Sequence, residues 1–139
     1  MSRKILLFGS FDVLHDGHRS LFRQAKNLAD ELVVVVARDQ TYKRARGYAP
    51  IHDEAFRRAM VASEEEVDRA ILGDLHQPYR RIREERPDII GLGYDQELFV
   101  EGLRTFLDEH GLKETRIERF SAYKPTIWKS SLLKKKQEE

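Results

Sequence analysis

Short apolar runs alternate along the chain with polar stretches whose apolar residues recur every three or four positions. Continuously apolar or β-branched runs of this length are typical of strands buried on both faces of a parallel sheet. Five such runs predict strands over 4–8, 32–37, 70–72, 88–92 and, most weakly, 116–120.

Residues with helical spacing fill the intervals between these strands. The apolar positions of the four expected helices are Leu21, Phe22, Ala25 and Leu28; Phe56, Met60 and Val61; those within 79–83; and Leu98, Leu103, Phe106 and Leu107. A basic helix is expected after the last strand. This alternation predicts an α/β fold with a mainly parallel five-stranded sheet and helices on both faces. Ligands of such sheets bind beyond the carboxyl ends of the strands, so functional residues are expected after Phe8, Ala37 and Leu92.

The length of 139 residues suits one domain, 1–139, with 134–139 as a frayed tail. A net charge of +1 gives no overall field that would favour nucleic acid or a membrane as a partner. The longest apolar run, 32–37, is too short to cross a bilayer, and no segment resembles a signal peptide. The absence of cysteine excludes disulfides and thiolate zinc sites and is compatible with the cytosol. A cytoplasmic protein is expected.

The chain reads Gly-Ser-Phe-Asp-Val-Leu-His-Asp-Gly-His over 9–18, directly after the first strand and before a helix. Gly9 can adopt a turn conformation and let backbone N–H groups approach a phosphate. His15 and His18 are three residues apart at the start of the helix, so both rings can lie on one side of its first turn. Gly17 between them leaves room for a ligand. With the unpaired N–H groups of the helix terminus, this segment predicts a polyphosphate site.

Such a site suits attack on the α-phosphate of a nucleoside triphosphate by an acceptor that is itself an ionised phosphate. The barrier lies in the charge on the transferring phosphoryl group and on the departing pyrophosphate. Fixed N–H donors that meet this charge are each worth about 100- to 1000-fold in rate. Two alternatives stay open: His15 and His18 could be a metal pair, or two incidental surface residues. Asp12 could orient His15 or cap the helix.

The pattern Gly-x-Phe-Asp-x-Leu-His-x-Gly-His resembles the signature of the cytidylyltransferase-like nucleotidyltransferases, over about 4–134. These proteins have a Rossmann-like fold, for which the strand order 3-2-1-4-5 is expected. The stretches 36–41, 70–73 and 87–96 are most similar to the archaeal-type FAD synthase subfamily, which transfers AMP from ATP to FMN. The alternative is a cytidylyl- or adenylyltransferase acting on glycerol 3-phosphate or a sugar phosphate.

The resemblance implies nucleotide contacts at the following residues: Ser10, Phe11, His15, Gly17, His18, Asp95 and Tyr123. Gly9 and Asp16, which belong to the same motif, are also expected to bind the nucleotide. The resemblance also implies Mg²⁺ and a homodimer. The Arg-Thr-Glu-Gly-Ile-Ser-Thr-Thr segment of the cytidylyltransferases is replaced by 123–131, which weakens a preference for CTP. Ser130 and Ser131 remain in this segment, placed to cap the last helix toward a phosphate.

Three further positions are candidates. Lys43 stands with Arg44 and Arg46 after the second strand, in what is expected to be a loop, and the resemblance implies that Lys43 reaches the phosphates. A solvated basic loop is the alternative. Arg57 matches the Arg that the family associates with the active-site phosphates. Because its neighbour Arg58 points about 100° away on a helix, only one of the two can face the site, and we expect it to be Arg57.

Asp95 follows the fourth strand and is expected beside the histidine pair, with a loop-capping role as its alternative. The aromatic residues that could stack on a flavin ring, or else belong to the core, are Tyr42, Tyr48, Phe99 and Trp128.

Overall fold

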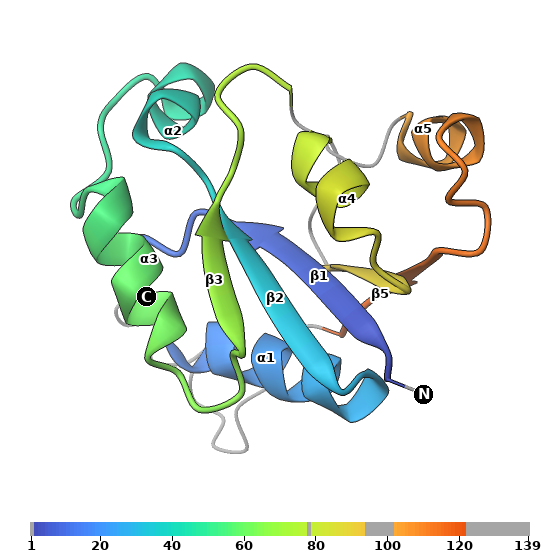
Figure 1. The fold of residues 1–139 in the computed structure, drawn as a ribbon. Helices are drawn as coiled ribbons and strands as arrows, with labels where there is room; N and C mark the ends of the chain where they lie inside the picture. Colours follow the sequence, from blue (N-terminus) through green and yellow to red (C-terminus); the bar gives the residue numbers. More distant parts are fainter. Residues whose placement is uncertain (1, 78, 94–101, 122–139) are drawn as a thin grey trace.

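The computed structural model describes residues 2–77, 79–93 and 102–121. In chain order the elements are β1 (Lys4–Gly9), α1 (Asp16–Leu28), β2 (Glu31–Val36), α2 (Asp39–Arg46), α3 (Glu54–Ala62), β3 (Arg69–Leu72), α4 (Arg80–Glu85), β4 (Ile89–Leu92), α5 (Leu103–Glu109) and β5 (Arg116–Arg119). Each neighbouring pair of strands is parallel, and their order in the sheet is β3-β2-β1-β4-β5. The expected fold and strand order are confirmed (Figure 1).

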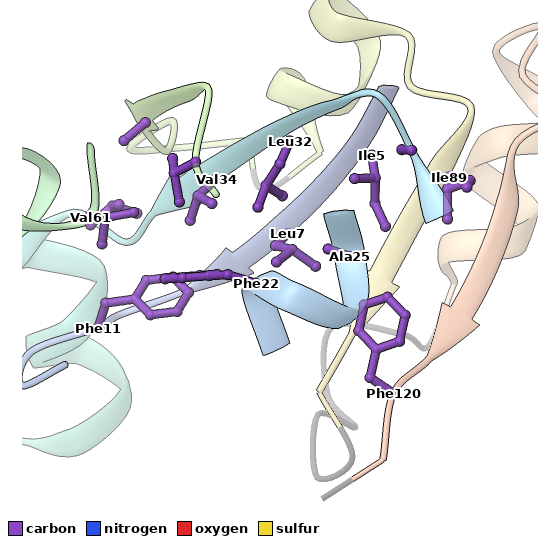
Figure 2. Packing of buried hydrophobic residues seen from close by; sticks show 14 residues of the cluster. Ile5, Leu7, Phe11, Phe22, Ala25, Leu32, Val34, Val61, Ile89 and Phe120 are labelled. Atoms are coloured by element: carbon purple, nitrogen blue, oxygen red, sulfur yellow. The ribbon is translucent and has the colours of Figure 1, made fainter. Parts of the chain in front are cut away.

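Helices pack on both faces of the sheet because successive strand residues point in opposite directions. Ile5 and Leu7 of β1 belong to one apolar cluster, together with Phe22 of α1 and Val61 of α3 (Figure 2). Leu6 lies between them in sequence and belongs to the opposite cluster. That second cluster also contains Ile82 of α4 and Leu103 and Leu107 of α5. The continuously apolar strands thus supply two cores, as their composition predicted.

Helix α3 is rotated relative to the expectation. Of the apolar positions Phe56, Met60 and Val61, only Val61 is buried, while Phe56 is 47% and Met60 40% exposed. The other buried side chain of this helix is the charged Arg57. Its guanidinium hydrogen-bonds to groups beneath the helix, and this turns the face that carries Arg57 and Val61 inward.

The expectation of a loop at Lys43, Arg44 and Arg46 is wrong, because these residues form the last turn of α2. The helix ends at Gly47, whose φ of 84° is left-handed and whose N–H donates to Lys43 O at 2.7 Å. Tyr42 is the buried residue of this short helix, so no apolar stripe marked it in the sequence.

Several expectations lie outside the described residues, namely Leu98 of the fourth stripe, the basic C-terminal helix and the tail 134–139. Among the residues that are described, no helix is long and apolar enough to cross a membrane.

Candidate nucleotide-binding site

The two histidines of the motif form the cap at the N-terminus of α1. His15 is the N-cap residue, and its Nδ1 accepts a hydrogen bond from Gly17 N at 3.0 Å. His18, in the first turn, accepts through its own Nδ1 from His15 N at 3.3 Å. The two rings stack with centroids 3.9 Å apart and planes inclined by 25°. Both imidazoles therefore lie on one side of the first turn, as their spacing predicted.

These caps fix where each neutral ring holds its hydrogen. Because Nδ1 of His15 and of His18 accepts a backbone N–H, the neutral tautomer of each has its hydrogen on Nε2. Burial, followed by the neighbouring charges of His15 and Arg19, lowers the pKa of His18 from 6.5 to about 4. His18 is therefore a neutral imidazole at pH 7, with one N–H to donate.

The buried ring of Phe11 packs against the histidine pair through His18. Phe11 is 4% exposed, and its ring meets the His18 ring edge-on at 5.1 Å. The Phe11 ring also lies 5.6 Å from the Phe22 ring (Figure 2). Phe11 itself has a φ of 52°, so the left-handed turn expected at Gly9 falls two residues later. Gly9 is required for another reason: a Cβ there would lie 2.6 Å from Phe11 Cζ. A nucleotide contact by Phe11 would have to come from its backbone.

Asp12 joins the motif to a segment about 40 residues away. Its carboxylate accepts hydrogen bonds from Ile51 N at 2.7 Å and His52 N at 2.9 Å, and Tyr42 Oη lies at 3.5 Å. Burial would raise its pKa, but the hydrogen bonds from His52 N and Ile51 N, together with the nearby charges of His52 and Arg57, outweigh burial and lower the pKa. Asp12 therefore neither orients His15 nor caps α1 in this structure, because both carboxylate oxygens face the 51–52 backbone.

Arg57 is enclosed beneath the same loop. Its side chain is 0% exposed and donates to Ser10 O at 2.8 Å, His52 O at 2.9 Å and Asp39 Oδ1 at 2.7 Å. Arg58 instead donates to Ala70 O at 3.3 Å, so Arg57 is the member of the pair that faces the motif. A fully enclosed guanidinium holds the backbone of the loop in place and presents no surface to a phosphate.

Helix α2 brings basic side chains to the same edge of the sheet. It follows β2, whose Val36 pairs with Gly9 at the end of β1, and in Figure 1 the heads of β1 and β2 point toward it. Lys43 and its basic neighbours are exposed on the last turn, and the Arg46 guanidinium lies 4.2 Å from the centre of the Tyr42 ring.

Asp16, the first residue of α1, is also exposed, and its carboxylate pairs with the Arg19 guanidinium at 3.5 Å.

The sequence did not reveal the roles of Asp39, Ile51 and His52, since two of them act through backbone groups that leave no side-chain pattern. Four predicted site residues lie outside the described residues, namely Asp95, Tyr123, Ser130 and Ser131. Within the described residues, the structure thus brings together 9–18, α2 and the start of α3.

A family model described as cytidylyltransferase-like matches residues 6–136. The chain belongs to this family. It is 44% identical to the FAD synthase of Thermoplasma acidophilum over 133 residues, and this matched region covers 96% of this chain and 92% of that protein. It is 42% identical over 120 residues to the FAD synthase of Aciduliprofundum boonei, covering 86% of this chain and 79% of that protein.

Solved structures agree with the fold. A Thermoplasma volcanium protein, described as a lipopolysaccharide core biosynthesis protein, superposes with a TM-score of 0.82 at 41% identity, covering 88% of this chain and 99% of that one. The pantoate-β-alanine ligase of Francisella tularensis gives a TM-score of 0.62 at 13% identity, covering 89% and 61%, respectively. The second likeness shows the fold alone.

Proposed function

We propose that this member of the cytidylyltransferase-like family is a FAD synthase, which transfers AMP from ATP to FMN and releases pyrophosphate. The observation on which this depends is the stacked His15–His18 pair, whose reciprocal caps leave both Nε2–H groups available to a ligand. The acceptor is chosen from the relatives named FAD synthase, which are 41–44% identical over most of the chain.

In the proposed reaction a phosphate oxygen of FMN attacks the α-phosphorus of ATP. The bond from that phosphorus to the oxygen bridging toward the β-phosphorus breaks, and pyrophosphate leaves with the electron pair. The FMN phosphate is already ionised, so no side chain has to remove a proton from it. The task of the protein is to hold the two phosphates in line and to stabilise the developing charge.

His15 and His18 would donate from Nε2 to the oxygens of the transferring phosphoryl group. A neutral donor fixed by a helix cap costs no reorganisation when charge develops, which is the basis of electrostatic stabilisation in active sites. Lys43 would add a positive charge from the exposed end of α2. Arg57 acts as a positioning residue, because its enclosed guanidinium holds Ser10 O and His52 O.

Further contacts to ATP are proposed at Gly9, Ser10, Asp16 and Gly17 in the motif, and in the C-terminal half at Asp95, Tyr123, Ser130 and Ser131. Within the described residues no three His, Asp or Glu side chains gather as metal ligands. We therefore treat Mg²⁺ as part of the substrate, because this ion is commonly held by substrate phosphates and retains several waters.

One alternative acceptor has an observation in its favour. The T. volcanium structure is described by a role in lipopolysaccharide core biosynthesis, which fits transfer to a sugar phosphate. The same site could serve that reaction, since the histidine pair meets only the phosphates.

The deciding experiment measures pyrophosphate release with Mg²⁺ while crossing ATP and CTP against FMN, glycerol 3-phosphate and heptose phosphate. ATP with FMN is expected to be the only strong pair, and its product should be FAD by chromatography. Turnover with CTP and glycerol 3-phosphate, but none with ATP and FMN, would replace the proposal by the alternative.

We also propose that the enzyme is a cytoplasmic homodimer that acts on small molecules and binds no nucleic acid. Sedimentation velocity tests the dimer. Titration with duplex DNA at low salt tests the last point, because binding through phosphate contacts would show a steep dependence on salt.

A further inference from the structure

Exposed apolar side chains gather in two segments of this protein. Among the described residues the exposed large apolar side chains are Val13 (54%), Tyr48 (62%), Ile51 (76%), Phe56 (47%) and Met60 (40%). Val13 belongs to the motif between β1 and α1, and the others fall within 48–60. Exposed apolar residues scattered singly are ordinary, but a group of them marks a binding surface.

Asp12 brings the two segments into contact. Its carboxylate holds Ile51 N at 2.7 Å and His52 N at 2.9 Å, and Val13 is the next residue along the chain. The Phe56 ring packs against the His52 ring with centroids 4.6 Å apart. Val13, Ile51 and Phe56 are thus fixed around one point of the loop that leads to His15.

Tyr48 reaches the same point through Tyr42. The two rings meet edge-on at 6.2 Å, and Tyr42 Oη lies 3.5 Å from Asp12 Oδ2. Tyr42 is only 8% exposed, so it supports the arrangement from within, while most of Tyr48 faces solvent. Of these two tyrosines, Tyr48 is the one that a ligand can reach.

We propose that Val13, Tyr48, Ile51 and Phe56 form the surface that binds the isoalloxazine ring of FMN, an inference that rests on the proposed function. The phosphate of FMN has to reach the His15–His18 pair. The ribityl chain separates that phosphate from a planar tricyclic ring with apolar faces. A ring surface should therefore adjoin the histidine motif without coinciding with it, and Val13 is two residues from His15.

The charges bordering this surface match the acceptor. Exposed Lys43 and Arg44 belong to α2, and Arg46 covers the Tyr42 ring at 4.2 Å. An anionic phosphate joined to an apolar ring suits a cationic helix next to an exposed apolar surface. Met60 lies one turn further along α3 from Phe56 and is left out of the proposed surface, so it provides a matched control.

The test compares Ile51→Ser and Phe56→Ala with Met60→Ser in the full chain. These side chains are exposed, so the variants should fold, which thermal unfolding verifies. FMN binding is followed by quenching of flavin fluorescence, and turnover is measured with FMN and with ribitol 5-phosphate, an acceptor that lacks the ring. Ile51→Ser and Phe56→Ala should each weaken FMN binding about 10-fold, as expected when apolar contact is lost from a binding surface. The ratio of kcat/KM for FMN to that for ribitol 5-phosphate should fall equally, and Met60→Ser should leave it unchanged.

The possible failures are distinguishable. If the native protein makes FAD but Ile51→Ser and Phe56→Ala bind FMN as it does, the surface is refuted while the proposed function stands. If these two variants dissociate a dimer in sedimentation velocity, the surface is an interface between copies, and the proposal is overturned. If the native protein forms no FAD, the proposed function fails. The titration of FMN with the native protein still tests the proposed ring-binding surface, and the absence of any change in FMN fluorescence overturns that surface.

Discussion

Replacement of His18 by Ala tests the central interaction of the site. The ring has one observed and one proposed role: Nδ1 accepts from His15 N at 3.3 Å, and we propose that Nε2–H donates to a phosphoryl oxygen. Removal of one such preorganised donor costs about 100- to 1000-fold in kcat, or about 2.7–4 kcal/mol. We expect a fall of this size in FAD formation under saturating ATP and FMN, with the protein still folded.

His18→Asn separates the two roles. The Asn side-chain oxygen can accept from the His15 backbone, as Asn commonly does near helix starts, but the variant lacks the imidazole Nε2–H. Both variants should therefore lose turnover, while His18→Asn should retain more of the stability. Wild-type turnover in His18→Asn would show that His18 serves only as a cap, which would refute the reasoning.

The pH dependence gives a second measurement on the same variants. The pKa of His18 is lowered to about 4 by burial, then by His15 and Arg19, whereas an unfolded His titrates near 6.5. Between these values the unfolded chain binds a proton that the folded chain does not. Stability therefore falls as the pH drops through this window and is fully present above it.

From pH 6.5 to pH 5 the full effect would be about 2 kcal/mol, and we expect about 1 kcal/mol because the ring remains partly exposed to solvent. Urea unfolding at both pH values should show that the native protein loses about 1 kcal/mol more than His18→Asn does. If the native protein and His18→Asn lose the same free energy of unfolding, the pKa of His18 in the folded protein is close to its ordinary value of 6.5, and the lowered pKa is refuted. The pH profile of turnover in the native protein should likewise contain no inflection near pH 6.5 that arises from His18. Any inflection in that range should therefore also be present in the profile of His18→Asn.

Three further outcomes follow from the structure. Arg57→Met should lower the free energy of unfolding by about 3 kcal/mol, because it leaves three acceptors without their donor; a loss below about 1 kcal/mol in urea unfolding would contradict this. Gly9→Ala should cost about 1–3 kcal/mol, since its Cβ would lie 2.6 Å from Phe11 Cζ, and an unchanged melting temperature would speak against that contact. Lys43→Ala should slow turnover about 10-fold or more, whereas an unchanged rate would reduce Lys43 to solvated surface.

The parallel sheet could be predicted because its strands are largely apolar and need cover on both faces, whereas the strand order was expected from the family resemblance. The position of His15 and His18 on one side of the first turn also followed from their spacing at a helix start, while the stacking of their rings was revealed by the structure. Helix α2 could not be predicted, because the single buried residue that anchors it, Tyr42, gives no periodic signal.

The orientation of α3 was missed for a related reason. Apolar periodicity assigns Phe56 and Met60 to the core, yet the buried hydrogen bonds of Arg57 decide which face turns inward. Sequence patterns record side-chain polarity, and they do not reveal a charged group whose partners are backbone carbonyls. The same limit hid the contact between Asp12 and the 51–52 backbone.

The mutual capping of His15 and His18 ties the orientation of both imidazoles to the first turn of α1. Whenever this turn frays, the rings lose the hydrogen bonds that orient them, so under the proposed mechanism the enzyme would be inactive each time the helix opens. Hydrogen exchange at the amides of Gly17 and His15 should therefore report how often the resting enzyme is ready to react.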